Sequence, residues 1–563
     1  MRVPRPSGLV IASDGRLLAI SGDQVVAIDP ATGTSTVIIA SGLTAPIGLA
    51  LSPSGEILVS QRGAAMQVAV FSAQGRPLRR IGRAGGRALS GPWQADGMLM
   101  PRGLACDSAG RLWVAEEDFA PRRLSIWEMR RGTLVRDLIG RSTYAATGAA
   151  INPDLPTMAA DTGTIFTLDW ATGSSRPAYT LPRMGVAPGA IFGWPFPGDS
   201  AVPHGKVRFL RYQGRQYLLR EDPPMQVLEL VDGRWLVRAA LGDVHTAFAL
   251  QRFPLPTLDP EIFAVFPGFN LAIWSSTPWP PPPTWKNQAF IWCDRDGDGL
   301  VQTAEVEVSD TLAGTWSGLH PRFADDLTAL LGDHAVKPAG HTDCGAPLYL
   351  MADVKPAVRP VTDHPNGWDV RLRTASGWLL ADGYRPGTWY DGSEAPGLLS
   401  GYAPDGERRR FYSSWFQVHG SHRAPSPRRG LLAGNWYFGG YVDLGGDLGE
   451  VVHMMGNVGQ HFLFTADGLY LAALFRDGRT GAAVPSSITR GDRIDDMSNE
   501  SEGWCSDFFR NATDRRIYLM SCPAHASGPV ISEVQGLENV RRLAGGTGRA
   551  GADRRLGRPP RQR

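Results

Sequence analysis

A glycine-spaced motif recurs along the first third of the chain and constrains the fold more than any other feature. Three clear copies begin at residues 8, 48 and 103, and a worn copy begins at Gly148. In each clear copy two glycines stand seven residues apart, an apolar run follows the first, and alternating apolar residues follow the second. The second glycine gives the backbone the freedom that a tight turn between strands needs. Each copy therefore predicts a strand, a turn and a second strand.

The spacing between the copies is typical of β-propeller blades. A unit of this length holds about four short strands. One four-stranded sheet leaves two apolar faces open, and radial packing of several sheets buries them. The 67 glycines and 44 prolines suit many short elements joined by turns. We predict an all-β fold, a β-propeller of four-stranded antiparallel blades, either as one large ring with inserted hairpins or as two rings. A β-sandwich array would lack this recurrence.

The best copy, Pro101–Glu116, resembles the repeats of NHL-type propellers and of the related gluconolactonase-like propellers. The resemblance covers residues 1 to about 185 and is weaker beyond them. Hairpins are expected at Val207–Leu219 and Arg371–Leu380, and partial copies of the motif lie at residues 465–472 and 512–519. The expected organisation is NHL-like blades in residues 1–185, degenerate blades with insertions and a calcium loop in 186–545, and a disordered tail in 546–563. The expected boundary is the Pro- and Gly-rich segment 185–205.

Residues 294–305 form a twelve-residue loop with the oxygen donors of a calcium site. Three aspartates alternate, Gly299 permits a sharp bend, and a glutamate closes the loop. Ca²⁺ takes six to eight oxygen ligands, and a loop of this spacing can wrap them around one ion. The loop resembles the EF-hand calcium loop, which implies a backbone carbonyl ligand from Leu300 and two oxygens from Glu305. The predicted ligands of Ca²⁺ are Asp294, Asp296, Asp298, Leu300, Gln302 and Glu305.

The flanks of this loop differ from those of an EF-hand. Gln288–Cys293 is an apolar, aromatic run that predicts a strand, and Val306–Val308 alternates like the start of another strand. No second loop of the kind occurs in the sequence. We therefore expect the ion to brace a turn between strands and expect no switching role.

Tryptophans and histidines are the side chains that could carry chemistry. Exposed indoles stack on sugar rings, although tryptophan also fills the gaps between blades. Loop histidines could act together as a general base for a lyase or hydrolase of polysaccharide, although structural roles are common for them. The tryptophan candidates are Trp274, Trp279, Trp285, Trp389, Trp415 and Trp436. The histidine candidates are His204, His364, His419, His422, His453 and His461.

The resemblance to gluconolactonase-like propellers also implies a divalent metal at the ring centre. That family holds the metal with Glu, Asn and Asp from separate blades. Glu116, at the end of the best motif copy, is a candidate member of such a set. No matching Asn and Asp can be placed in this sequence, which separates it from the lactonase pattern.

Charge and cysteine content narrow the partners. The net charge is +2 and no basic stripe is present, which argues against a nucleic-acid partner. No run of about eighteen apolar residues occurs, so no membrane span is expected. Cys505 and Cys522 could pair across neighbouring strands or remain buried thiols. Residues 1–6 contain no apolar signal core, and a natural leader could be missing.

Calcium loops of modest affinity fill best where calcium is millimolar, which favours an extracytoplasmic or secreted location. The favoured function is a calcium-stabilised extracytoplasmic propeller that binds a glycan or protein partner without catalysis. The alternatives are a carbohydrate-active lyase or hydrolase with its site in the propeller channel, and a metal-dependent lactonase. A channel lined by His, Arg and Tyr favours the lyase or hydrolase, and a Glu/Asn/Asp cage favours the lactonase.

Overall fold

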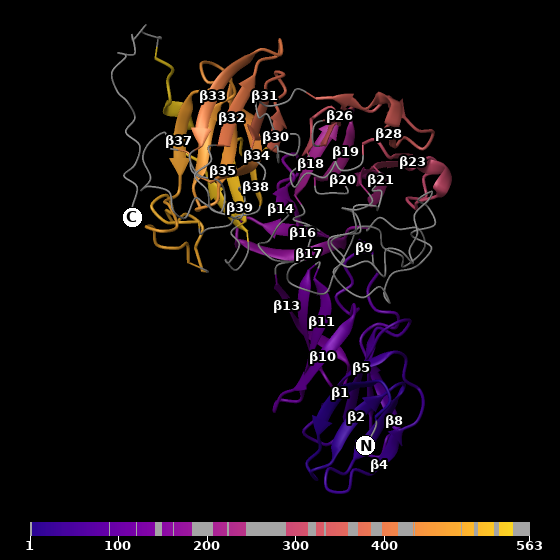
Figure 1. The fold of residues 1–563 in the computed structure, drawn as a ribbon. Coiled ribbons are helices and arrows are strands. Elements are labelled where there is room, and N and C mark those ends of the chain that lie inside the picture. Colours follow the sequence, from indigo (N-terminus) through magenta and orange to yellow (C-terminus); the bar gives the residue numbers. More distant parts are fainter. Residues whose placement is uncertain are drawn as a thin grey trace, which may run out of the picture.

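A computed structural model shows a chain built almost wholly from antiparallel strands (Figure 1). Within the described residues, helix is limited to the 3-10 turns η3 (Thr303–Glu305), η4 (Met351–Asp353) and η6 (Leu537–Asn539). Over the same residues, no helix has the length and apolar character to cross a membrane. The structure describes residues 3–182 apart from 89, 120, 141–148 and 162, and then 206–221, 225–243, 289–312, 322–331, 334–357, 370–383, 397–414, 432, 434–499 apart from 486, 505–522 and 529–543.

The predicted motif copies form the first two strands of the first three sheets. Gly15, Gly55 and Gly110 close the turns with φ of +85°, +84° and +75°, a left-handed conformation that favours glycine. These three sheets make the lower lobe in Figure 1. Their strands are β1 (Pro6–Ile11), β2 (Leu17–Ser21), β3 (Gln24–Ile28) and β4 (Ser35–Ile39); β5 (Pro46–Leu51), β6 (Ile57–Gln61), β7 (Gln67–Phe71) and β8 (Pro77–Ile81); and β10 (Pro101–Cys106), β11 (Arg111–Phe119), β12 (Arg122–Glu128) and β13 (Thr133–Gly140).

Six further sheets make the upper lobe in Figure 1. The first three contain β14 (Ala149–Ile151), β15 (Met158–Asp161), β16 (Thr164–Asp169) and β17 (Ser174–Thr180); β18 (Val207–Tyr212), β19 (Arg215–Arg220), β20 (Met225–Val231), β21 (Arg234–Asp243), β22 (Ala289–Cys293) and β23 (Val306–Ser309); and β24 (Arg322–Phe323), β25 (Ala329–Leu331), β26 (His334–Val336) and β29 (Lys355–Pro356). A hairpin of β27 (Gly340–His341) and β28 (Pro347–Leu348) interrupts the last of these. The other three contain β30 (Val370–Arg373), β31 (Leu379–Gly383), β32 (Gly397–Tyr402) and β33 (Arg408–Ser414); β34 (Asn435–Asp443), β35 (Glu450–Gly456), β36 (His461–Thr465) and β37 (Tyr470–Leu474); and β38 (Cys505–Arg510), β39 (Ile517–Cys522) and β40 (Val530–Glu533).

The six upper sheets close into a ring through their first strands. β14 contacts β18, β24 contacts β30, β30 contacts β34, and β34 contacts β38, which returns to β14. The remaining join, between the β18 and β24 sheets, is made by Phe323, whose backbone N donates to Glu221 and whose carbonyl accepts from Arg208. The first strands therefore surround a common axis, and the fold is an all-β propeller, as the repeats predict.

Apolar clusters between neighbouring sheets hold the ring together. Leu218 and Phe290 of the β18 sheet pack with Ile165 of the β14 sheet, and Tyr217 and Leu219 pack with Phe323 on the other side. One large cluster also joins the β30, β34, β38 and β14 sheets. Full burial of one such side chain contributes about 1.5–3 kcal/mol to stability, so each sheet depends on its neighbours.

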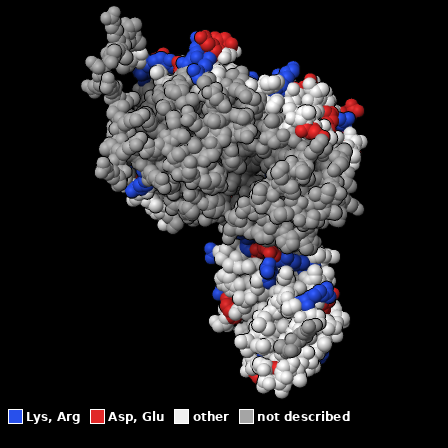
Figure 2. Space-filling model, viewed as in Figure 1, with Lys and Arg blue, Asp and Glu red and all other residues white. Residues whose placement is uncertain are grey.

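The three lower sheets form an open arc that joins the ring at one side. β1 and β10 each contact β5, and a Cβ at Gly48 would lie 1.8 Å from the carbonyl oxygen of Arg102, so only glycine fits there. The short strand β9 (Gly91–Pro92) leaves the arc and pairs with β17 of the ring. Figure 2 shows Lys and Arg interspersed with Asp and Glu on the described part of one face, without a continuous stripe of either sign there.

Both predicted hairpins are confirmed, since β18 pairs with β19 around Gln213–Gly214 and β30 pairs with β31. The domain boundary near residue 185 stays a prediction; β14, which precedes it, contacts ring strands β18 and β38. The expected boundary segment from residue 185 to 205 and the expected tail lie outside the described residues. The backbone register places Cys505 opposite Cys522, and the choice between a disulfide and two thiols stays open.

Candidate functional site

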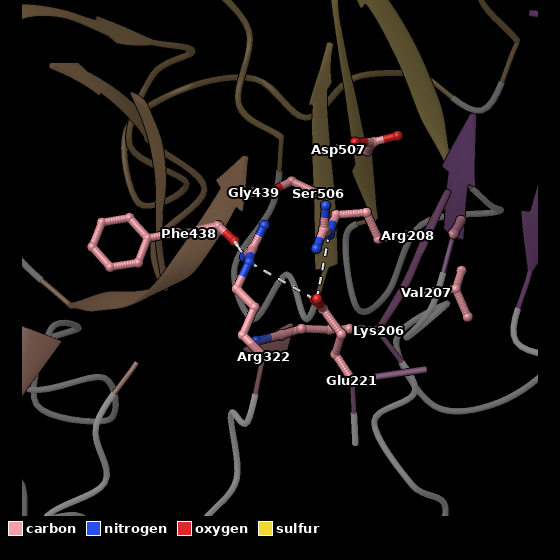
Figure 3. A pocket seen from close by; sticks show the side chains of 10 residues that line it. Lys206, Val207, Arg208, Glu221, Arg322, Phe438, Gly439, Ser506 and Asp507 are labelled. Atoms are coloured by element: carbon pink, nitrogen blue, oxygen red, sulfur yellow. Dashed lines mark hydrogen bonds and ion pairs between the residues drawn. The ribbon is translucent and has the colours of Figure 1, made fainter. Parts of the chain in front are cut away.

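A pocket opens on the ring axis, where charged side chains from several sheets converge (Figure 3). Most of its lining comes from β14, β18, β24, β34 and β38, each the first strand of its sheet. Propeller geometry explains the convergence, because first strands face the axis and carry their polar residues toward it. The lining residues are Ala149, Lys206, Val207, Arg208, Glu221, Arg322, Phe438, Gly439, Ser506 and Asp507.

Arg208 is held on one wall of the pocket by two carboxylates. Its Nε donates to Glu221 Oε1 at 3.3 Å, and another guanidinium nitrogen donates to Asp325 Oδ1 at 2.8 Å. Tyr441 donates its hydroxyl proton to the other oxygen of Asp325. Burial alone would lower the pKa of Arg208, but the two carboxylates more than offset it and raise that pKa. The guanidinium therefore stays charged and fixed in orientation.

Arg322 is more deeply buried and less completely paired. One guanidinium nitrogen donates to the carbonyl of Phe438, while Nε lies 3.9 Å from Glu221 Oε2, beyond hydrogen-bond length. Nε is buried and has no hydrogen-bond partner. Burial lowers the pKa of Arg322, because the charged form loses its hydration there. The result is a guanidinium with an unused donor beside the pocket.

Asp507 lines the same pocket and has a perturbed carboxyl group. Removal from water raises its pKa to about 7, although Arg208, Arg322 and a hydrogen bond from the backbone N of Ile151 pull it down. The group can therefore exchange a proton near neutral pH, which suits acid–base chemistry.

Of the six candidate histidines, the structure describes His453 and His461 and brings them together. His453 Nε2 and His461 Nδ1 lie 2.7 Å apart, and His453 Nδ1 lies 3.4 Å from the hydroxyl of Ser506. Burial lowers the pKa of His461 to about 3 and that of His453 well below 6.5, with His461 and Arg322 adding to the second shift. Both rings are therefore neutral at physiological pH. The other candidate histidines lie outside the described residues, and of the candidate tryptophans only the backbone of Trp436, within β34, is described.

The predicted calcium loop connects β22 to β23, two strands added to the outer edge of the β18 sheet. Asp294, Asp296 and Glu305 bring carboxylate oxygens within 4.8 Å of one another and could hold a metal ion. Gly297 and Gly299 turn the chain with φ of +90° and +72°. The strands on either side match the prediction from sequence.

Hydrogen bonds inside the loop fix the orientation of its carboxylates. The backbone N of Gly297 donates to Asp294 Oδ1 at 2.8 Å, and the backbone N of Arg295 donates to Glu305 Oε1 at 2.6 Å. The indole of Trp292 donates to Glu305 Oε2 at 2.9 Å. N–H groups of the backbone and of one indole thus hold the carboxylates of the first and last residues of the loop.

One further observation fits a hard cation in this loop. Gln302 donates its amide Nε2 to Asp298 Oδ2 at 2.9 Å, while its Oε1 is buried without a hydrogen-bond partner. An orphaned carbonyl oxygen beside clustered carboxylates is the donor set that Ca²⁺ prefers. The backbone N of Leu300 donates to Asp298 Oδ1 at 2.6 Å. That the Leu300 carbonyl binds the ion stays a prediction.

Glu116 lies in the arc, away from the ring axis, between two guanidiniums. Its oxygens accept from Arg87 and Arg123, and both arginines lie over the indole of Trp93. Burial raises the pKa of Glu116 against the pull of the two arginines. Because positive charge already satisfies both oxygens, this carboxylate does not fit the metal cage that the gluconolactonase resemblance implied.

Comparisons with known proteins give similarity at the level of fold. No family model matches the chain, and no curated protein matches it. Solved structures with weak similarity include hydrazine synthase from Kuenenia stuttgartiensis, 14% identical over 40% of this chain and 64% of that one, with a TM-score of 0.20. A gluconolactonase from Xanthomonas campestris is 16% identical over 42% and 76%, with a TM-score of 0.20. Virginiamycin B lyase from Staphylococcus aureus is 8% identical over 83% and 94%, with a TM-score of 0.18.

This chain spans less than two thirds of the hydrazine synthase chain that it matches. The similarities are too weak to carry an argument about activity, and the assignment of the propeller rests on the sheets and their contacts. The chemistry has to be read from the side chains of the ring axis and the acidic loop.

Sequence reasoning missed the residues that define the axial pocket. Arg208, Glu221, Arg322 and Asp507 come from three sheets, and no local motif marks them. The one available signal was polar residues within strands, such as Ser506 and Asp507 in Cys505–Arg510.

Proposed function

We propose that this protein is a calcium-stabilised, extracytoplasmic propeller that binds a carboxylate-bearing glycan at the axial pocket. The observation that supports the proposal is the pair of guanidiniums of Arg208 and Arg322, which converge from different sheets on one pocket. Guanidinium N–H groups match the geometry of a carboxylate, and the Nε–H of Arg322 is a donor without a hydrogen-bond partner. The buried Lys206 adds positive charge at the same place.

Protonation of Asp507 would help an anion to bind. A carboxylate ligand beside an ionised Asp507 would meet like-charge repulsion, and the raised pKa of Asp507 removes much of that charge near neutral pH. Anion binding and proton uptake are therefore linked at this site.

Calorimetry with acidic and neutral oligosaccharides tests the proposal. Galacturonate oligomers should bind, and neutral galactose oligomers of equal length should bind at least about tenfold more weakly, because one hydrogen bond between charged groups contributes about 1.5–3 kcal/mol. Arg322→Met should remove the preference. Arg211→Met is the matched control, since Arg211 lies on the same strand as Arg208 but is exposed and paired with Asp154. Equal binding of both sugars, or wild-type binding by Arg322→Met, would contradict the proposal.

The calcium part of the proposal has its own test. Asp296→Ala combined with Asp298→Ala should abolish the increase in melting temperature that calcium gives the wild type, because an ion stabilises only the state that binds it. A chelator should lower the melting temperature of the wild type and leave the variant unchanged. A wild-type melting temperature that ignores the chelator would count against the calcium site.

The second candidate function is a lyase or hydrolase that uses the same pocket, and Asp507 favours it. A carboxyl group with pKa of about 7 can remove or donate a proton, and the neighbouring guanidiniums could neutralise a substrate carboxylate. A lyase would convert galacturonate oligomers to products with a conjugated double bond, and Asp507→Asn should stop that reaction. If the oligomers bind and ultraviolet absorbance does not rise, the protein binds them without lyase activity.

A further inference from the structure

A chain of polar side chains leads from the axial pocket into the space between the β34 and β38 sheets. It begins at Ser506, which lines the pocket, and continues to His453 Nδ1 at 3.4 Å. His453 Nε2 lies 2.7 Å from His461 Nδ1, and His461 Nε2 lies 3.1 Å from the side-chain amide of Asn499. Four side chains from separate parts of the sequence thus form one hydrogen-bonded line.

The surroundings show that this line is built into the fold. His453, His461 and Asn499 are 0%, 1% and 4% exposed, while Ser506 remains accessible from the pocket. Phe508 packs against His453 with ring centroids 5.8 Å apart, and Phe475 packs against His461 at 5.4 Å. These rings exclude water from the inner part of the line, so its groups interact with one another.

Gly439 makes the approach of serine and histidine possible. A Cβ at this position would lie 2.3 Å from both His453 Nδ1 and Ser506 Oγ. Figure 3 shows Gly439 beside Ser506 at the pocket. A side chain there would separate the hydroxyl from the ring nitrogen.

The line can accept the proton of Ser506 and move it inward. When His453 carries its proton on Nε2, its Nδ1 accepts from the Ser506 hydroxyl, and Nε2–H donates to His461 Nδ1. His461 then carries its own proton on Nε2, so this arrangement needs the Asn499 amide turned, with Oδ1, which is otherwise buried without a partner, in the place of Nδ2. If the proton of Ser506 passes to His453 Nδ1, the Nε2 proton can pass on to His461. The positive charge then rests on His461, and the turned amide of Asn499 accepts from Nε2 in both states. His461 also escapes the repulsion that Arg322 exerts on a charged His453.

We propose that Ser506 is the nucleophile of an esterase site, with His453 as its general base and His461 as the relay that receives the charge. Serine hydroxyls become nucleophilic when a positioned imidazole removes the proton. Ser506 Oγ attacks the carbonyl carbon of an ester, the bond to the alcohol oxygen breaks, and the histidine pair returns the proton to the departing alkoxide. Water then attacks the acyl carbon and gives a proton to His453. As the bond between the acyl carbon and Oγ breaks, that proton passes to Oγ, which releases the carboxylic acid and restores the serine hydroxyl.

The activity goes beyond the proposed glycan binding and does not depend on it. An O-acyl ester is the substrate class, since the acyl carbon must reach a serine at the wall of the pocket. Asn499, which bonds to the inner nitrogen of His461, is a positioning residue because it acts through that ring.

Covalent labelling of the full-length protein tests the proposal. A small fluorophosphonate should modify Ser506, as seen by mass spectrometry of the peptides, and 4-nitrophenyl acetate should give a burst of 4-nitrophenolate. Ser506→Ala should abolish both signals. His453→Gln should slow labelling at least about a hundredfold, the usual contribution of a positioned general base. Ser54 is the internal control, because it is exposed and its hydroxyl bonds to another serine, Ser52, and not to a ring nitrogen.

A purely structural role for the line predicts different results. Folded wild-type protein that takes no label on Ser506, or equal labelling rates in wild type and His453→Gln, would overturn the proposal. If His453→Gln does not fold, Asn499→Ala replaces it, and a labelling rate equal to that of wild type overturns the relay. Loss of glycan preference in Arg322→Met with labelling of Ser506 intact would separate this activity from the proposed function.

Discussion

Arg238 gives the sharpest test of the calcium loop, because its guanidinium occupies one oxygen of a predicted ligand. It donates to Asp294 Oδ2 at 2.6 Å and to Glu229 Oε2 at 3.1 Å, and its side chain is 4% exposed. Arg238→Met keeps the packing of the stem and removes the charge. We expect this variant to bind calcium more tightly than the wild type while being less stable without calcium.

The magnitude follows from the distances. An ion bound to Asp294 would lie about 6 Å from the guanidinium, and repulsion between a single and a double positive charge at that distance is about 1.4 kcal/mol even in bulk water. Calcium affinity should therefore rise at least about tenfold. Without calcium the change breaks a buried ion pair, which typically costs about 3–5 kcal/mol.

Calcium calorimetry and melting curves with and without chelator measure both effects. Arg238→Lys is the matched control, since it keeps a positive charge near Asp294 and should leave calcium affinity close to that of the wild type. If folded Arg238→Met binds calcium no more tightly than the wild type, the ion does not use Asp294 as predicted.

Three further predictions concern the ring axis. Gly439→Ala should lower stability by about 1–3 kcal/mol through overpacking, while Gly340→Ala, which meets nothing within 4 Å, should leave the melting temperature unchanged. For Asp507, the pKa of about 7 lies above the unfolded value, so the stability of the protein should fall as pH rises toward and through 7. The affinity for carboxylate-bearing oligomers should fall over the same pH range, and calorimetry on Asp507→Asn should show neither loss. For His461, the pKa of about 3 lies below the unfolded value, so stability is complete above pH 6.5 and is lost as pH falls toward 3; acid unfolding followed by circular dichroism should begin at lower pH in His461→Gln.

The arc could be predicted closely because its signal is local. A turn glycine and its flanking apolar residues are neighbours in sequence, and Gly15, Gly55 and Gly110 all adopt the expected conformation. The acidic loop has the same kind of local signal, since the spacing of its carboxylates is read from neighbouring residues, and its use for calcium stays a prediction. The guanidinium that bonds to Asp294, from Arg238, lies 56 residues away in the sequence and has no motif.

The axial site could not be predicted, because ring closure creates it. Arg208 meets Asp325 across 117 residues, and Ser506 meets His453 across 53. Each residue is unremarkable in its own strand, and only the closed ring makes them neighbours. The sequence named His453 and His461 as candidates, but the separation of eight residues did not reveal that they lie on adjacent strands with their ring nitrogens 2.7 Å apart.

The outermost position of β23 has a consequence for handling this protein. Glu305 directly precedes β23, so an ion that fixes Glu305 also anchors that strand against β22. Residues Ala289–Cys293 of β22 are fully buried, apolar and uncharged. Detachment of β23 would expose the unpaired backbone N–H and C=O groups of β22, and a strand from another molecule could pair with them. Chelators would then cause aggregation at temperatures well below those at which the ring itself unfolds.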